Sequence, residues 1–200
     1  KAVHDYGGGD INNDGRYVDG SGTAAGRKVR RDEAYEQSAV GFLNHYKGER
    51  PFCLIVSLVG PHDVQAYPGR GIKGLGLKPL YARAGYDLAA FEYLPIDAPP
   101  TVDENITTKP TVHRSIRRIL DVGVGSCRTR QQQRTYARFY AYLCREVDRQ
   151  ILKVLDALDA NGLTEDTLIV RTSDHGELAM AHSGMREKFY NVYREALNVP

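Results

Sequence analysis

The chain has 200 residues, of which 42% are hydrophobic, so it can bury a sizeable core as one or two domains. Its 27 lysines and arginines against 25 acidic residues give a net charge of +2, which excludes a generally basic protein built to coat nucleic acid. No apolar run approaches the roughly 18–20 residues of a membrane span, and no charged-then-apolar leader opens the chain. We therefore expect a soluble protein, with the choice between cytoplasm and periplasm or exterior left open.

The first part of the chain predicts a loop, a helix and a strand. Residues 1–31 hold three consecutive glycines and many turn residues without apolar periodicity, which is typical of a loop. From Asp32, a candidate N-cap, apolar residues recur at helical spacing as far as Tyr46, which predicts a helix that ends near Lys47 and Gly48. The apolar run 52–58 then has the pattern of a strand buried on both faces.

The second part predicts a long irregular excursion, a long helix and another strand. Residues 61–130 are rich in glycine and proline and predict only a short helix around 112–120. Apolar residues spaced three and four apart predict a helix over 131–160, and the following Asn161-Gly162 predicts its left-handed stop. Residues 167–172 predict a second buried strand.

This order of elements predicts an α/β fold with a mainly parallel sheet flanked by helices. A polar motif follows each predicted strand: Gly60-Pro61-His62-Asp63 after the first and residues 173–177 after the second. Ligands of open α/β sheets bind just beyond the carboxyl ends of the strands. Both motifs are therefore expected at the functional edge of the sheet.

Two groups of residues in these motifs are candidates for a site. Asp174 and His175 offer a carboxylate and an imidazole, which suit a divalent cation, and Gly176 would let the backbone turn so that both approach one point. Alternatively, the aspartate caps a turn beside an exposed histidine. His62, His182 and Lys188 could surround a tetrahedral anion, or each could be a solvated loop residue.

Several stretches together are similar to motifs of one family. Residues 172–177 read T-S-D-H-G-E, 182–185 read H-S-G-M, and 188–200 read K-F-Y-N-V-Y-R-E-A-L-N-V-P. Residues 51–62, with P-F and P-H, and residues 142–167, with the long helix and its G-L turn, complete the set. These motifs resemble those of the sulfatases, in the alkaline-phosphatase superfamily.

The resemblance implies a partial alkaline-phosphatase-like sulfatase core and a sulfuric ester hydrolase of the arylsulfatase type. It implies that Asp174 and His175 bind a divalent metal, usually Ca²⁺. It also implies that His62 and Lys188 contact the sulfate oxygens, with Lys188 near the leaving oxygen. His182 is a further catalytic candidate, and Asp63 would orient its neighbour.

The chain also departs from the family pattern. Sulfatases use a formylglycine made from Cys or Ser in a C/S-x-P-x-R motif, and neither the three cysteines nor any serine stands in that motif here. The paired acidic motif that gives the other metal ligands is also absent, and Arg194 replaces a usual glutamate. We therefore expect an internal fragment, inactive alone, that acts with the remaining sulfatase polypeptide on a sulfate-ester small molecule or a sulfated glycan.

The expected organisation is one partial catalytic domain over 1–200. Its parts are a loop-rich 1–31, a helix and strand in 32–60, a variable substrate-side insertion in 61–130, and a long helix, strand and metal/oxyanion motif in 131–200. The three cysteines, without a C-x-x-C pair, are expected to be reduced thiols. The stretch from Asp10 to Ser21 opens like an EF-hand loop but lacks its final glutamate, which favours an Asx-rich turn.

Two alternative functions remain at this point. The first is hydrolysis of a phosphate or phosphonate ester at the same site, with Mn²⁺ or Zn²⁺. The second is a non-catalytic module that binds anions or nucleic acid through the segment 113–138. That segment holds seven arginines against one acid, Asp121: Arg114, Arg117, Arg118, Arg128, Arg130, Arg134 and Arg138. The near-zero net charge disfavours nucleic acid, and no membrane partner is expected.

Overall fold

The computed structural model describes residues 23–24, 27–28, 31–48, 50–67, 81–82 and 85–199. The Asx-rich stretch 10–21 lies outside these residues, as does most of the predicted loop 1–31. The chain divides into two compact units, one of residues 1–60, 83–85 and 144–169 and the other of residues 61–82, 86–143 and 170–200. The long helix α4 (Arg130–Ala160) contributes to both.

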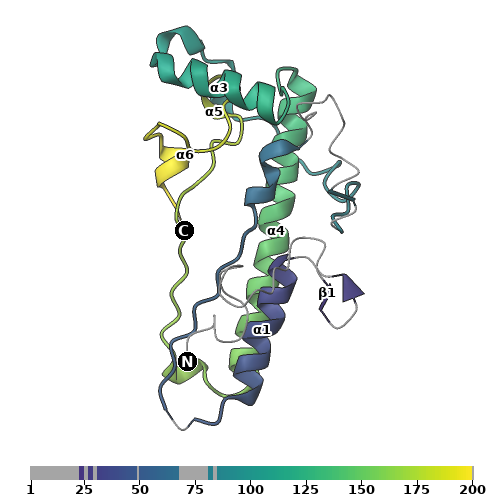
Figure 1. The fold of residues 1–200 in the computed structure, drawn as a ribbon, viewed down its shortest axis with the longest axis vertical. Helices are drawn as coiled ribbons and strands as arrows, with labels where there is room; N and C mark the ends of the chain where they lie inside the picture. Colours follow the sequence, from purple (N-terminus) through teal and green to yellow (C-terminus); the bar gives the residue numbers. More distant parts are fainter. Residues whose placement is uncertain are drawn as a thin grey trace. The chain divides into compact units, whose positions relative to one another are not determined.

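Two helices form the first unit. Helix α1 (Arg31–His45) lies beside the C-terminal part of α4 (Figure 1). Their apolar faces meet in a small core, because both sequences repeat apolar residues at helical spacing. Lys153 also bridges to Glu36 at 2.8 Å. The core consists of Phe42, Leu43, Ala157 and Leu158, with Phe52, Leu54 and Leu163 against it.

The N-terminus of α1 and the C-terminus of α4 can be compared with the predicted helix ends. Asp32, predicted as the N-cap of α1, lies one residue inside that helix, and its carboxylate accepts hydrogen bonds from the N–H groups of Val59 and Gly60, both at 2.7 Å. Helix α4 ends as predicted, with Gly162 in the left-handed region at φ 67°. A 3₁₀ turn, η5 (Thr164–Asp166), follows.

The two predicted strands have no regular secondary structure in the described residues. Within the part of the chain that the structure describes, neither 52–58 nor 167–172 pairs with another strand. The described sheet consists of β1 (Thr23–Ala24) and β2 (Arg27–Lys28), which pair antiparallel. Leu168 and Val170 are 89% and 74% exposed. The expected parallel sheet is therefore not formed among the described residues, because these strands have no neighbours there.

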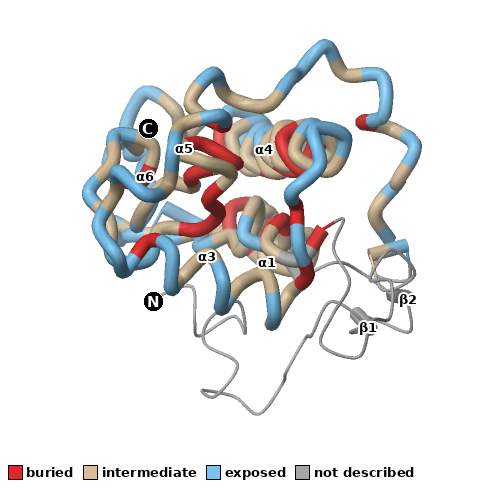
Figure 2. The backbone as a smooth tube through the Cα atoms, turned by 90° about the horizontal axis from the view of Figure 1, so that it is seen from above, coloured by how far each residue is buried: buried red, intermediate tan, exposed pale blue. Residues whose placement is uncertain are grey.

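The second unit packs short elements around the N-terminal part of α4. Figure 2 marks its buried positions in red. Aromatic side chains from the chain before α4 pack against that helix: the rings of Tyr67 and Phe139 lie 4.2 Å apart between centroids, and Phe91 lies 5.1 Å from Phe139. Helix α3 (Thr111–Gly123) confirms the short helix predicted around 112–120. The elements are η2 (His62–Ala66), η3 (Pro100–Asp103), η4 (Ile106–Thr108), α3 (Thr111–Gly123), α5 (Ala181–Gly184) and α6 (Arg194–Leu197).

The arginines of 113–138 mostly have local partners. Arg134 pairs with Asp97 at 3.1 Å, and Arg138 donates to the carbonyl oxygen of Ile96 at 3.0 Å. Arg128 pairs with Asp121, Arg130 with Asp103, and Arg117 with Ser183. Exposed pairs of this kind each contribute about 0–1 kcal/mol, but they fasten the irregular segment 92–103 to α4. Three of the seven arginines thus pair with carboxylates within the unit, which weakens the anion-binding alternative.

Two further features are the state of the cysteines and the length and apolar character of the helices. The three cysteines are free thiols, as predicted: Cys53 is exposed, Cys127 is buried, and Cys144 is intermediate. Among the described residues, no helix has the length and apolar character to cross a membrane.

Candidate functional site

Asp174 and His175 form the centre of the candidate site. Nε2 of His175 lies 3.4 Å from Oδ2 of Asp174, whose side chain is 84% exposed. Nδ1 of His175 lies 2.9 Å from the carbonyl oxygen of Gly176. Because a carbonyl oxygen can only accept, this contact requires a proton on Nδ1, so Nε2 is the ring nitrogen that a cation would use.

The spacing of this pair fits ligands of one divalent cation. Two ligands about 2.3–2.6 Å from Ca²⁺ and at right angles to each other lie roughly 3.3–3.7 Å apart. Within the described ranges, no cluster of three or more His, Cys, Asp or Glu side chains could hold a metal ion. The pair therefore supplies part of a cation site at most, and its metal role stays a prediction.

Gly176 is required for a reason that the sequence analysis did not anticipate. A Cβ atom at this position would lie 2.0 Å from the backbone oxygen of Glu195, and the Gly176 N–H donates to the carbonyl oxygen of Ala196 at 2.8 Å. Its φ angle is not among those in the left-handed region. Close approach to the backbone of α6, rather than a sharp turn, explains the glycine beside His175.

Lys188 is held by its neighbour in the chain. Its ammonium nitrogen lies 2.9 Å from Oε2 of Glu187, whose side chain is only 4% exposed. The same nitrogen lies 5.2 Å from the centre of the Phe189 ring. Because a lysine ammonium has three N–H donors, this arrangement orients the side chain and leaves donors for an anion.

Glu177 is a functional candidate that the sequence analysis quoted only as part of a motif. Its carboxylate accepts hydrogen bonds from the backbone N–H groups of Ala179 and Glu187 and from the hydroxyl of Tyr136 at 2.9 Å. Burial raises the pKa of Glu177, and burial followed by the nearby Glu177 raises the pKa of Tyr136. No local pattern marks the contact with Tyr136, which lies 41 positions away.

His182 lies between two carboxylates. Its Nδ1 is 3.1 Å from Oε2 of Glu104, its Nε2 is 3.2 Å from Oε2 of Glu195, and its ring stacks on Tyr193 with 3.8 Å between centroids. Hydrogen bonds from Lys109 and then from His182 lower the pKa of Glu104. A sulfate contact by His182 would require it to release one carboxylate, and this role stays a prediction.

His62 begins η2 and is exposed, and its neighbour Asp63 is held by two tyrosines. The carbonyl oxygen of Asp63 accepts from the hydroxyl of Tyr81 at 2.6 Å, and its carboxylate accepts from the hydroxyl of Tyr86. The structure thus brings Asp174 and His175 together. In the described part of the second unit, no hydrogen bond or ion pair joins His62, Lys188 or His182 to that pair.

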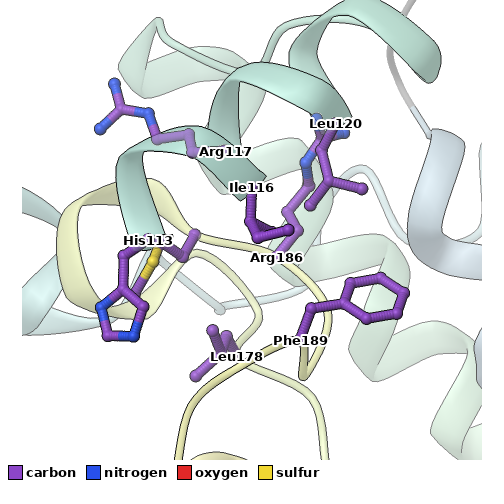
Figure 3. Close-up of a pocket in the computed structure, with 8 residues that line it drawn as sticks. His113, Ile116, Arg117, Leu120, Leu178, Arg186 and Phe189 are labelled. Carbon is purple, nitrogen blue, oxygen red and sulfur yellow. The ribbon is translucent and has the colours of Figure 1, made fainter. Parts of the chain in front are cut away.

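A small pocket lies beside the loop that carries Lys188, between that loop and α3 (Figure 3). Two of its polar side chains make hydrogen bonds to backbone: Nε2 of His113 is 3.2 Å from the carbonyl oxygen of Tyr190, and Arg186 donates to the carbonyl oxygen of Gly125 at 2.7 Å. The pocket holds none of the predicted site residues. Its lining consists of His113, Ile116, Arg117, Leu120, Leu178, Met185, Arg186 and Phe189.

Comparison with known proteins identifies the family of this chain. A Bacteroides thetaiotaomicron protein whose crystal structure carries a provisional sulfatase assignment matches with a TM-score of 0.65 and 21% identity, over 92% of this chain and 37% of that chain. The fold is therefore that of a part of this larger structure. The sulfatase family profile matches residues 10–200, and the chain belongs to the sulfatase family.

Curated relatives agree with this assignment. Arylsulfatase K of Gallus gallus is 38% identical over 74 residues, which are 36% of this chain and 13% of that protein. Arylsulfatase K of Rattus norvegicus is 26% identical over 189 residues, which are 87% of this chain and 29% of that protein. The chain thus spans less than a third of the length of these relatives.

Proposed function

We propose that this chain is part of a sulfuric ester hydrolase, in which Asp174 and His175 bind the divalent cation while His62 and Lys188 bind the sulfate oxygens. The family match over residues 10–200 carries this proposal. The position of Nε2 of His175, 3.4 Å from the Asp174 carboxylate, supports the cation site. The match to sulfatases also disfavours the phosphate-ester and nucleic-acid alternatives.

Each residue has a defined chemical task in this proposal. The cation, when bound, withdraws charge from the sulfate oxygens. The ammonium of Lys188, oriented by Glu187, donates hydrogen bonds where negative charge develops on the leaving oxygen. The exposed imidazole of His62 donates to another sulfate oxygen. The nucleophile, a formylglycine, would lie in polypeptide outside this chain.

The remaining polypeptide also completes the fold in this proposal. Residues 52–58 and 167–172 would become strands of a mainly parallel sheet, which would bury the exposed Leu168 and Val170. The remaining cation ligands would come from outside the described residues. We propose Ca²⁺ from the family resemblance, although an imidazole ligand also suits Mn²⁺ or Zn²⁺. The substrate would be a sulfate ester of a small molecule or of a glycan.

Turnover of p-nitrophenyl sulfate and p-nitrophenyl phosphate by the full-length polypeptide tests the function. We expect faster hydrolysis of the sulfate ester, loss of activity on chelation, and one bound metal whose identity elemental analysis gives. Asp174→Asn should lower kcat/KM by about 100-fold or more, because loss of a ligand weakens metal binding. Asp156→Asn, an exposed control on α4, should not. Preferential hydrolysis of the phosphate ester, or full activity of Asp174→Asn, would contradict the proposal.

A further inference from the structure

Residues 178–187 form a closed loop, and Lys188 follows directly after it. The N–H of Leu178 donates to the carbonyl oxygen of Glu187 at 3.3 Å, and the N–H of Met180 donates to that of Met185 at 2.8 Å. Left-handed backbone is costly for residues other than glycine and persists where the surroundings hold it in place. Five such residues occur here: Ala179, Met180, His182, Ser183 and Glu187.

The carboxylate of Glu177 holds both ends of this loop. It accepts from the N–H of Ala179, whose φ is 45°, at 3.1 Å. It also accepts from the N–H of Glu187, whose φ is 66°, at 3.0 Å to one oxygen and 3.1 Å to the other. The hydroxyl of Tyr136, a fully buried residue of α4, donates to the same carboxylate and so fixes it to a helix. Two left-handed residues are thereby anchored to one buried group.

The position of Lys188 follows from that of Glu187. The Glu187 side chain is almost fully buried, and its Oε2 lies 2.9 Å from the Lys188 ammonium. A shift of the Glu187 backbone would therefore move the Cα atom of Lys188. It would also move the Glu187 carboxylate, which orients the Lys188 ammonium. Only Glu177 provides a side-chain acceptor for the Glu187 N–H among the contacts of the described residues.

We propose that Glu177 is a positioning residue, which acts through Glu187 to place the Lys188 ammonium beside the leaving oxygen of the sulfate ester. This inference rests on the proposed function, which assigns that place to Lys188. A displacement of about 1 Å at a reacting group can cost on the order of 100-fold in rate. Loss of the hydrogen bonds from the Glu187 N–H to Glu177 should accordingly slow the chemical step more than it weakens substrate binding.

The test compares two aryl sulfates with the full-length enzyme, one with an acidic phenol as leaving group and one with a weakly acidic phenol. Glu177→Gln keeps one acceptor oxygen but replaces the other by an amide NH₂. Because the Glu187 nitrogen lies 3.0 and 3.1 Å from the two carboxylate oxygens, this NH₂ would face a donor in either orientation. We expect kcat to fall about 10-fold or more for the weakly acidic leaving group, a smaller fall for the acidic one, and little change in KM. The exposed control Glu165→Gln should leave both rates unchanged.

A double-variant cycle separates this inference from the proposed function. If Glu177 acts through Lys188, adding Glu177→Gln to Lys188→Ala should cost little beyond Lys188→Ala alone. If Lys188→Ala itself does not change the leaving-group dependence, the proposed role of Lys188 is wrong. If Lys188→Ala changes it and Glu177→Gln does not, or if the two effects add fully, the positioning role is wrong.

Glu187→Gln keeps the inference testable if Glu177→Gln does not fold. This variant retains the backbone N–H that Glu177 binds but weakens the ion pair with Lys188. It should also make the rate more sensitive to the leaving group. An unchanged leaving-group dependence would overturn the inference.

Discussion

The backbone N–H of Glu187 lies 3.0 and 3.1 Å from the two carboxylate oxygens of Glu177, although ten positions separate these residues in the chain. The contact closes the loop that precedes Lys188 and joins it to the motif of Asp174 and His175. The proposed cation ligands and the proposed sulfate-binding lysine are therefore parts of one connected segment. Substitutions that disturb this segment should affect both groups.

Gly176→Ala should destabilise the full-length protein. The new Cβ would meet the Glu195 backbone oxygen at 2.0 Å, so α6 or the site motif must shift. Overpacking of this kind costs about 1–3 kcal/mol, or more where backbone must move. Denaturant unfolding gives the free energy of unfolding. Gly41→Ala in α1, where a Cβ meets nothing within 4 Å, is the control and should be neutral or stabilise by about 0.5–1 kcal/mol. Equal effects would show that the close approach is absent.

Val170→Asp should destabilise the full-length protein far more than Val122→Asp. The two valines are similarly exposed in the described structure, at 74% and 64%. Val170 lies in a proposed strand of the completed sheet, whereas Val122 lies on α3. Loss of a buried valine alone costs about 1.5–3 kcal/mol, and a buried charge adds to that. Thermal unfolding of both variants checks this, and a harmless Val170→Asp would contradict the proposed sheet.

Cys53 should react with a maleimide much faster than Cys127. Cys53 is exposed, whereas Cys127 is 4% exposed, and burial raises the pKa of the Cys127 thiol despite the nearby Arg186. Because the thiolate is the reactive form, both low access and a raised pKa slow Cys127. Mass spectrometry of peptides after timed labelling of the isolated 200-residue chain measures the two rates. Rapid labelling of Cys127 without denaturant would show that its surroundings are open.

Glu104 should contribute stability that disappears in acid. Its pKa is lowered from 4.5, mainly by the hydrogen bond from Lys109 and then by that from His182. A carboxyl with a lowered native pKa stabilises the protein above the unfolded value, and this contribution is lost as the pH falls through the native pKa. Glu104→Gln should therefore be less stable than the parent near neutral pH, and the difference should shrink below about pH 4. Urea unfolding over this pH range measures it. A constant difference would indicate that the carboxylate's charge is unimportant.

Local sequence patterns determined the helices and the position of the polar motifs. The apolar spacing predicted α1 and α4, and Gly162 ends α4 as expected, because these features depend on residues within one or two turns. The order of motifs also pointed to the family that the profile identifies.

The tertiary structure decided the partners of the site residues. His182 meets Glu104, 78 positions away, and Glu177 meets Tyr136, 41 positions away. Gly176 is required by the backbone of α6 rather than by its own conformation. Such contacts depend on the path of the whole chain, which periodicity does not encode. The strands show the same limit, since an apolar run predicts extended backbone but its pairing depends on neighbours that lie elsewhere in the polypeptide.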